Sequence, residues 1–160
     1  MTDALVSGYI RILVAVAMQH LSNLMAKSSM WAFSFAYDMS THICISFMDQ
    51  RLRLAVNGLL VNLHLLAIPM FYRHTAVNQF NPITKVMDAM NSNWRDKLIG
   101  HSWDGENTMT GCSGGVITLL EKQATNGVLR VRCPAHQIDL VIMEVLAMIE
   151  DGLFVEGINR

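Results

Sequence analysis

Two aspartates stand where this chain could hold a metal ion. Asp38 follows an apolar, aromatic-rich run at residues 31–37, and Asp104 follows a second apolar run at residues 97–103. An acid at the carboxyl end of a strand in an α/β sheet lies where such sheets usually bind their ligands. If the two strands are neighbours, Asp38 and Asp104 can hold a divalent cation for chemistry on phosphodiesters. The structural alternative is that each acid caps a turn or the start of a helix.

The composition is that of one folded domain. The chain has 160 residues, of which 52% are hydrophobic and 16% charged, which excludes a disordered chain and predicts a largely buried interior. The formal net charge is −1, so the chain lacks the strongly basic character of a protein that binds nucleic acid over a wide surface. Contacts with nucleic acid are therefore expected to be local, or to come from other parts of a longer protein.

The cysteines and the apolar segments indicate the cellular compartment in which the chain is expected. Cys44, Cys112 and Cys133 are odd in number and widely spaced, which argues against a disulfide framework and favours a reducing, intracellular compartment. The amino-terminal residues lack the basic start of a signal peptide. Residues 54–71 are the most membrane-like, but polar residues and a proline interrupt them. They therefore predict two strands joined by a turn, and no membrane partner is expected.

Hydrophobic periodicity predicts helices and strands in a definite order. Asn57-Gly58 is the strongest short signal for a two-residue hairpin turn, and Asn81-Pro82 predicts the start of a helix. The expected elements are a helix over 3–26; strands over 31–37, 42–56 and 59–70; a helix from 81 through 94; a strand over 97–103; a helix from 116 to 126; a strand over 128–132; and a last helical stripe over 138–149.

This order of elements predicts the fold class. A three-strand antiparallel meander followed by alternating helices and strands is typical of an α/β domain with a mixed five-stranded sheet and helices on both faces. A right-handed crossover lays the strand at 97–103 parallel to the strand at 31–37. Asp38 and Asp104 are then expected at neighbouring strand ends.

The same order, with acids at the ends of the first and fourth strands, resembles the ribonuclease H-like fold of nucleases and transposases. Four stretches narrow the resemblance to hAT-type transposases and together extend over nearly the whole chain. They are Met30-Trp31-Ala32-Phe33 before Asp38-Met39-Ser40-Thr41; His64-Leu65-Leu66-Ala67-Ile68-Pro69-Met70 with Arg73-His74-Thr75; Asp104-Gly105-Glu106-Asn107-Thr108-Met109-Thr110-Gly111; and Arg132-Cys133-Pro134-Ala135-His136-Gln137-Ile138-Asp139-Leu140.

The resemblance implies a catalytic set of two aspartates and a distant glutamate, which works with Mg²⁺ or Mn²⁺ on DNA in the nucleus. Asp38 and Asp104 match the two aspartates, as catalytic residues and as metal ligands. His136 matches the histidine of the family's Cys-x-x-His segment, which lies beside the active site and contacts DNA. The glutamate has no match, because in the family it follows a helical insertion that this sequence does not reach. We therefore expect a fragment in which DNA cleavage and strand transfer are incomplete.

Such a fragment has an expected division along the chain. Residues 1–29 form an N-terminal helix that packs on the core, residues 30–152 form the ribonuclease H-like domain, and residues 153–160 are a tail at the point of truncation. Apolar surface left by the missing regions favours self-association into a homo-oligomer. The alternative function is a non-catalytic remnant that binds nucleic acid or protein partners.

Three side chains are candidates for contact with DNA, namely Asn107, Arg132 and His136. Asn107 can contact phosphate or orient Asp104, or it can satisfy free N–H groups at a helix start. Arg132 belongs to a set of alternating arginines that forms either a basic stripe or a solvated strand face. His136 either faces DNA, as the resemblance implies, or caps the last helix.

Two other motifs point to chemistry that is not expected here. Cys133-x-x-His136 has half of a zinc-site spacing, but no second pair of ligands follows a matching pattern, so zinc is not expected. Residues 111–115 match the Gly-x-Ser-x-Gly elbow of serine hydrolases around Ser113. That mechanism needs a strand that leads directly into the serine, and the strand here is expected to end at Asp104.

Overall fold

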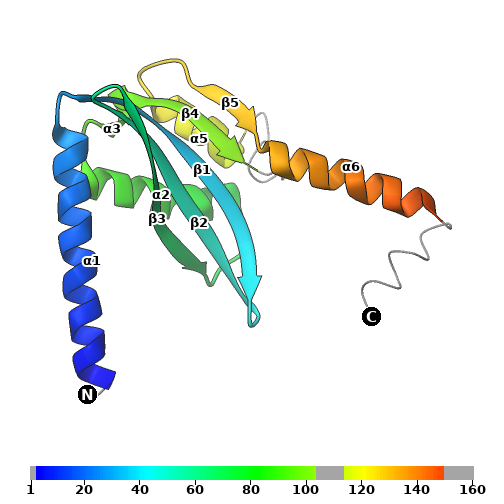
Figure 1. Ribbon diagram of the computed structural model, residues 1–160, viewed down its shortest axis with the longest axis horizontal. Coiled ribbons are helices and arrows are strands. Elements are labelled where there is room, and N and C mark those ends of the chain that lie inside the picture. Colours follow the sequence, from blue (N-terminus) through cyan, green and yellow to red (C-terminus); the bar gives the residue numbers. More distant parts are fainter. Residues whose placement is uncertain (1–2, 104–113, 150–160) are drawn as a thin grey trace.

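We describe the fold from a computed structural model of the chain, over residues 3–103 and 114–149. A long helix and a three-stranded meander come first, and helices then alternate with strands (Figure 1). The elements are α1 (Asp3–Ala26), β1 (Met30–His42), β2 (Ile45–Val56), β3 (Leu59–Met70), α2 (Ala76–Met90), α3 (Trp94–Lys97), β4 (Leu98–Trp103), α5 (Val116–Gln123), β5 (Leu129–Arg132) and α6 (Pro134–Met148).

The strands form one five-stranded sheet in the order β3-β2-β1-β4-β5. β1 pairs antiparallel with β2 and β2 with β3, whereas β4 runs parallel to β1 and β5 parallel to β4. The parallel pairs follow the long connections through α2 and α5, because parallel neighbours need a crossover and cannot be joined by a hairpin. The predicted α/β class and the mixed sheet, with a three-strand meander and two parallel strands, are confirmed.

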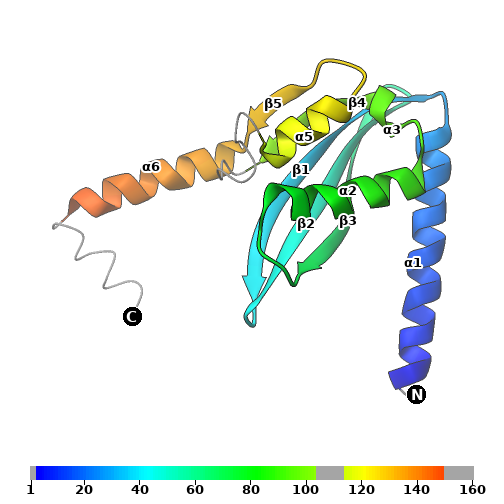
Figure 2. The same cartoon turned by 180° about the vertical axis from the view of Figure 1, so that it is seen from behind.

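The core lies between one face of the sheet and the helices α2 and α5, which cross in front of the sheet in Figure 2. β1 sends Phe33, Phe35 and Tyr37 to this face, and all three are buried. Met87 of α2 and Leu120 of α5 are buried against the same core cluster. Alternate residues of a strand point to opposite faces, so the period of two in β1 decides which side of the sheet is apolar.

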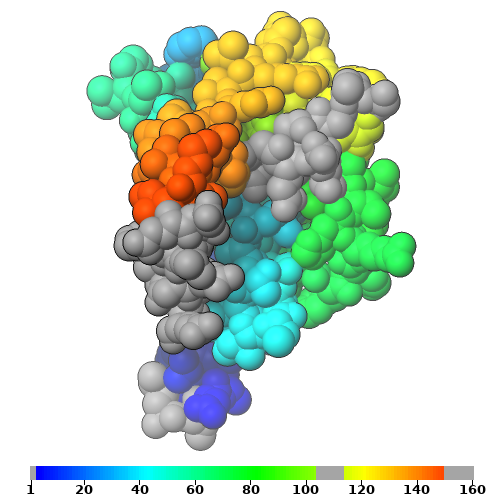
Figure 3. Space-filling view, turned by 90° about the vertical axis from the view of Figure 1, so that its right-hand side faces the viewer, coloured from blue at the N-terminus to red at the C-terminus, as the bar shows by residue number. Residues whose placement is uncertain are grey.

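The opposite face of the sheet, which we call the open face, carries polar side chains. Ser34, Ala36 and Asp38 alternate with the buried aromatic residues of β1, and Arg53, Arg51 and Asp49 of β2 pair with them in register. Among the described helices, only the first turn of α6 borders this face. The start of α6 is thus the helix that borders this second face, and beyond its start α6 continues outward from the sheet, toward the viewer in Figure 3.

β1 is longer than predicted and does not end at Asp38. It continues to a hairpin turn formed by Ile43 and Cys44, so the prediction of one strand over residues 42–56 is wrong in its first residues. The φ angles of Ile43 and Cys44 are 47° and 63°, both in the left-handed region. Two positive φ values are what a type I′ hairpin turn requires, but they are normally supplied by Asn and Gly. Asp38 therefore lies inside a strand pair and not at a strand terminus.

α2 begins at Ala76, before the predicted start at Asn81. Thr75 caps the helix, because its side-chain oxygen accepts a hydrogen bond from the backbone N–H of Asn78 at 3.3 Å. Pro82 consequently lies inside the helix and not in its first turn. Most helical stability in proteins comes from packing of an apolar face, and the buried face of α2 against the sheet offsets the hydrogen bond that this proline cannot make.

Two further helix boundaries differ from the predictions. Trp94, expected in the helix of α2, begins the separate short helix α3, and its Nε1 donates to Asp88 of α2 at 2.9 Å. Arg95 also donates to Asp88, at 2.6 Å, and its guanidinium lies 4.6 Å from the Trp94 ring centroid. α5 ends at Gln123, before the predicted end at residue 126.

The first and last helices are largely exposed. In α1 only Met25 is buried, and the end of the helix is closed by Lys97, whose Nζ donates to the carbonyl oxygens of Met25 at 2.7 Å and Lys27 at 3.2 Å. α1 is also long and apolar enough to cross a membrane, with a mean hydropathy of 1.5 over a stretch that is 0% buried. Buried core helices and N-terminal signal sequences pass the same test of length and composition. No residue of α6 is buried.

Candidate functional site

A hollow of about 410 Å³ lies where the first turn of α6 meets β1, β2 and β4 on the open face. We call it the acidic hollow, because three carboxylates line it, those of Asp38, Asp49 and Asp139. His136 lines it as well. The structure thus brings together Asp38 and His136, two of the residues predicted from the sequence to form a site, although nearly one hundred positions separate them.

The two strand aspartates of the hollow lie directly opposite each other, Asp38 on β1 and Asp49 on β2. Like charges in such a pair repel, because the Cβ atoms of opposite residues are only about 4.5–5.5 Å apart. Asp49 has two partners: Arg51 Nε donates to its Oδ2 at 3.0 Å, and His64 Nε2 contacts its Oδ1. Asp38 is exposed and makes no side-chain hydrogen bond with the described residues. Its carboxylate is therefore available to a ligand.

The start of α6 positions the other two acidic-hollow residues, His136 and Asp139. They are three positions apart, which places both side chains on one face of the helix. Pro134 occupies the first helical position, where its fixed φ favours a helix start. The N–H of Cys133 donates to the carbonyl oxygen of Trp103 at 2.8 Å and so ties the start of α6 to the end of β4.

β4 ends beside the same hollow. Its parallel pairing with β1 runs as far as Ala36 and Ser102, and Trp103 is its last residue. Asp38 thus stands just beyond the level at which β4 ends. The sequence continues from Trp103 directly into Asp104, which lies outside the described residues. The predicted meeting of Asp38 and Asp104 therefore stays a prediction.

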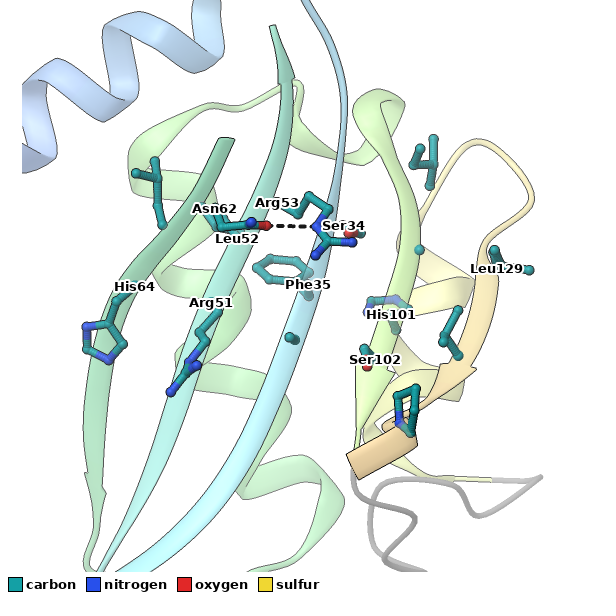
Figure 4. A pocket seen from close by; sticks show the side chains of 16 residues that line it. Ser34, Phe35, Arg51, Leu52, Arg53, Asn62, His64, His101, Ser102 and Leu129 are labelled. Atoms are coloured by element: carbon teal, nitrogen blue, oxygen red, sulfur yellow. Dashed lines mark hydrogen bonds between the residues drawn. The ribbon is translucent and has the colours of Figure 1, made fainter. Parts of the chain in front are cut away.

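A larger hollow of about 910 Å³ adjoins the acidic hollow, and we call it the open-face hollow. On one side of it, Arg53 Nε of β2 donates to Asn62 Oδ1 of the neighbouring β3 at 2.7 Å, as Figure 4 shows. Its two sides differ in character. The side formed by β2 and β3 is polar and basic, with Arg51, Arg53, Asn62 and His64, whereas the side formed by β4, β5 and the start of α6 is apolar, with Ile99, Leu129, Val131 and Pro134.

Arg132 lies away from both hollows. It pairs with Trp103, whose side chain is buried on the covered side of the sheet, so alternation places Arg132 on that side too. Its neighbour Arg130, two positions earlier on the same side, donates from Nε to Glu121 of α5 at 2.6 Å. Arg132 and His136, both predicted to contact DNA, thus lie on different sides of the sheet.

The predicted metal ligands are described only in part. Within residues 3–103 and 114–149, no group of three or more His, Cys, Asp or Glu residues is placed to hold a metal ion. Cys133 and His136 both line the acidic hollow. Asn107 and Ser113, like Asp104, lie outside the described residues. A site for Mg²⁺ or Mn²⁺ at the acidic hollow thus depends on Asp104 as its next ligand.

An ionisable side chain that no sequence motif marks, His101, is buried on the covered face of the sheet. It is 1% exposed and stacks with Phe35 and Tyr37, at ring-centroid distances of 6.0 and 6.2 Å. Burial lowers the pKa of His101 to about 4, so the ring is neutral at pH 7. Burial likewise raises the pKa of Tyr37 well above its usual value. Both rings therefore serve as neutral packing groups.

Sequence reasoning missed two of the three carboxylates in the acidic hollow, Asp49 and Asp139. Asp49 lies as far after the turn at residues 43–44 as Asp38 lies before it, so a correctly placed turn would have paired them. Strand length gave no signal, because β1 and β2 have 13 and 12 residues and themselves exceed the usual 3–10. For Asp139 the signal was Pro134, which marks the helix start.

No protein-family model matches the chain, and no curated protein matches its sequence.

Proposed function

We propose that this chain is the ribonuclease H-like domain of a hAT transposase-like protein, and that its acidic hollow binds Mg²⁺ or Mn²⁺ and the phosphodiester backbone of DNA. One observation carries the proposal. Asp38 and His136 come from widely separated stretches that each resemble this family, and they line one hollow beside the end of β4. The sequence runs from that end directly into Asp104, the second aspartate of the resemblance.

The residues of the hollow suit a hard divalent cation. Asp38 offers an exposed carboxylate, and Asp104 is the second ligand that we propose. Asp139 adds negative charge at the rim, while Arg51 and His64 hold the carboxylate of Asp49 in place. A cation bound there supplies polarisation of a phosphoryl oxygen and activation of water. His136, on the facing helix turn, is placed to hydrogen-bond a phosphate oxygen.

Charge makes the DNA contact conditional on the cation. The acidic hollow contains three carboxylates and one guanidinium, and the whole chain has a net charge of −1. A phosphate that approaches this surface is repelled unless a divalent cation neutralises it. DNA binding at the acidic hollow therefore requires Mg²⁺ or Mn²⁺.

Nicking of supercoiled plasmid DNA in the presence of Mn²⁺ tests the proposal. Because the glutamate of the family's catalytic set has no match in this sequence, we expect only slow nicking by the unsubstituted chain. The rate should fall by more than about 100-fold in Asp38→Asn and in Asp104→Asn, because even groups that only support metal ligands change activity by about 10–100-fold. The matched control is Asp3→Asn, the same change in the first turn of α1, which should nick at the unsubstituted rate. Equal rates in all the variants would contradict the proposal.

A second candidate function is a non-catalytic module that binds nucleic acid or protein. One observation favours it, namely that the described residues contain no set of three metal-binding groups. In this case the plasmid stays intact with Mn²⁺, and duplex DNA or a protein partner is still bound. Nicking that is lost in Asp38→Asn would exclude this candidate.

A further inference from the structure

We propose that α6 of one copy of this chain docks on the open face of a second copy, and that the second copy returns the same contact. The pair is then a twofold-symmetric dimer formed by exchange of α6. The inference concerns an interaction surface and does not depend on the proposed activity on DNA. Its basis is an exposed apolar helix, a matching sheet face, complementary charge and a very short connection between β5 and α6.

The helix α6 has an apolar stripe without a partner in the described structure. Ile138, Ile142 and Val145 recur at helical spacing on one side, with exposed fractions of 61%, 49% and 52%. α6 is 15 residues long, and helices of about 12–15 residues are marginal in water unless an apolar face is packed. The helix therefore gains stability if this stripe is covered.

The open face offers apolar surface of the right kind. Ile99, Leu129 and Val131 line one side of the open-face hollow, with exposed fractions of 42%, 67% and 41%. These residues come from β4 and β5, which lie side by side at one edge of the sheet. The volume of about 910 Å³ leaves room for the side chains of a helical stripe.

The charges of the two surfaces are complementary. α6 contains Asp139 and Glu144 and has no Lys or Arg. The far side of the open-face hollow carries Arg51 and Arg53, and Arg53 donates to the neutral amide of Asn62. Asp139 lines the acidic hollow of its own copy, so Glu144 is the carboxylate that a docked α6 brings toward the guanidinium groups while its stripe meets the apolar side.

The connection between β5 and α6 explains why the partner is a second copy. β5 ends at Arg132 and α6 begins at Pro134, so Cys133 alone joins them. Connections between strands and helices usually need 2–6 residues, and the fixed φ of Pro134 removes further freedom. α6 cannot turn back over its own sheet through this link. A short hinge of this kind favours exchange of an element between identical chains.

Reciprocal docking also increases the buried area. Each copy buries one helix and one sheet face, which is twice the area of a one-way contact. A helix of this length is about 22 Å long and about 10 Å wide with its side chains. Specific interfaces bury about 800 Å² on each partner, and reciprocal docking brings the buried area closer to this size than a one-way contact does.

Sedimentation velocity of the full chain and of single variants tests the proposal. We expect a dimer for the unsubstituted chain, and dimerisation at least 10-fold weaker in Ile142→Glu on the stripe and in Val131→Glu on the open face. The matched control is Leu140→Glu, which places the same side chain at an exposed position on the other side of α6 and should leave the dimer intact. A monomer for the unsubstituted chain overturns the proposal.

Mixing the two weakened variants separates this arrangement from other dimers. The Val131→Glu copy retains a normal α6 and the Ile142→Glu copy retains a normal open face, so an equimolar mixture has one intact contact and should associate more strongly than either variant alone. If α6 of one copy instead paired with α6 of the other, the unmixed Val131→Glu variant would remain dimeric. That result would overturn the proposal.

Hydrogen–deuterium exchange on the unsubstituted chain gives a test that does not depend on the folding of any variant. Protection of α6 and β5 should rise together as the protein concentration increases through the dimerisation range. Protection that is independent of concentration overturns the proposal.

Discussion

His101 is the single residue at which the pH dependence of this fold should be most visible. Its ring lies against the rings of both Phe35 and Tyr37, and its two nitrogens have no hydrogen-bond partner among the described residues. A charged imidazolium there would be removed from water. The charges of Glu121 and Arg130 act on it in opposite directions, so burial is the largest effect and lowers the pKa. The fold thus tolerates His101 in its neutral form alone.

Acidification should therefore destabilise the protein through His101. The unfolded chain binds a proton at this residue below about pH 6.5, whereas the folded chain does so only near its pKa of about 4. Unfolding takes up a proton in this window, so the stabilising effect of the neutral ring is fully present above pH 6.5 and is lost as the pH falls to 4. The loss amounts to about 3 kcal/mol in the free energy of unfolding.

The variant His101→Phe should remove this dependence, because phenylalanine keeps the stacking and cannot be protonated. Urea unfolding at several pH values between 4 and 7 measures the effect, and His42→Phe, at an exposed position, is the matched control that should retain the slope of the unsubstituted chain. The same pH slope in His101→Phe as in the unsubstituted chain would show that His101 does not remain neutral in the fold.

At the scale of elements, the hairpin between β1 and β2 sets the position of Asp38 with a poorly suited turn. Ile43 and Cys44 both have positive φ angles, which cost L-residues about 1–2 kcal/mol each in the left-handed region. The next hairpin uses Asn57 and Gly58 with φ angles of 51° and 77°, where these residue types fit well. The first hairpin is thus stabilised by the long pairing of β1 with β2 and not by its turn.

The double substitution Ile43→Asn with Cys44→Gly should raise the free energy of unfolding by about 1–2 kcal/mol, because it relieves this backbone strain. Ile43 is 81% exposed, so little apolar burial is lost. Thermal unfolding measures the change. Leu59→Asn, an exposed position in a regular strand, serves as the control that should not stabilise. No gain in the double variant would mean that the turn differs from the type I′ geometry described here.

These two hairpins show what sequence can and cannot predict about elements. Asn57-Gly58 marks its turn because the residue types match the required φ angles, whereas Ile43 and Cys44 give no such signal. Pro82 likewise led to a wrong prediction of the residue at which α2 begins. The N-cap at Thr75 and the buried face of the helix stabilise α2 by more than this one proline destabilises it. Turn residues and helix-start residues give wrong boundaries where the packing of a whole strand or helix determines the structure.

At the scale of the whole molecule, the order of elements was enough to predict the fold class. Periods of two and of 3.6 identify strands and helices, and the right-handed crossover rule then leaves few arrangements of five strands. The candidate site was harder. The register of the β1–β2 hairpin places Asp49 in the candidate site, and the direction of α6 places Asp139 there. Neither the register nor the direction follows from local sequence patterns. Exposure of the open face likewise depends on the single residue that links β5 to α6.

The charge of the acidic hollow leads to a prediction for the intact chain. Fluorescence anisotropy of labelled duplex DNA, titrated with protein in Mn²⁺ and in EDTA, tests most directly whether the hollow is a metal-dependent DNA site. We predict binding in Mn²⁺ that weakens at least 10-fold in EDTA, loss of that difference in Asp38→Asn, and its retention in Asp3→Asn. Equal affinity with and without Mn²⁺, or an unchanged Mn²⁺ dependence in Asp38→Asn, would contradict it.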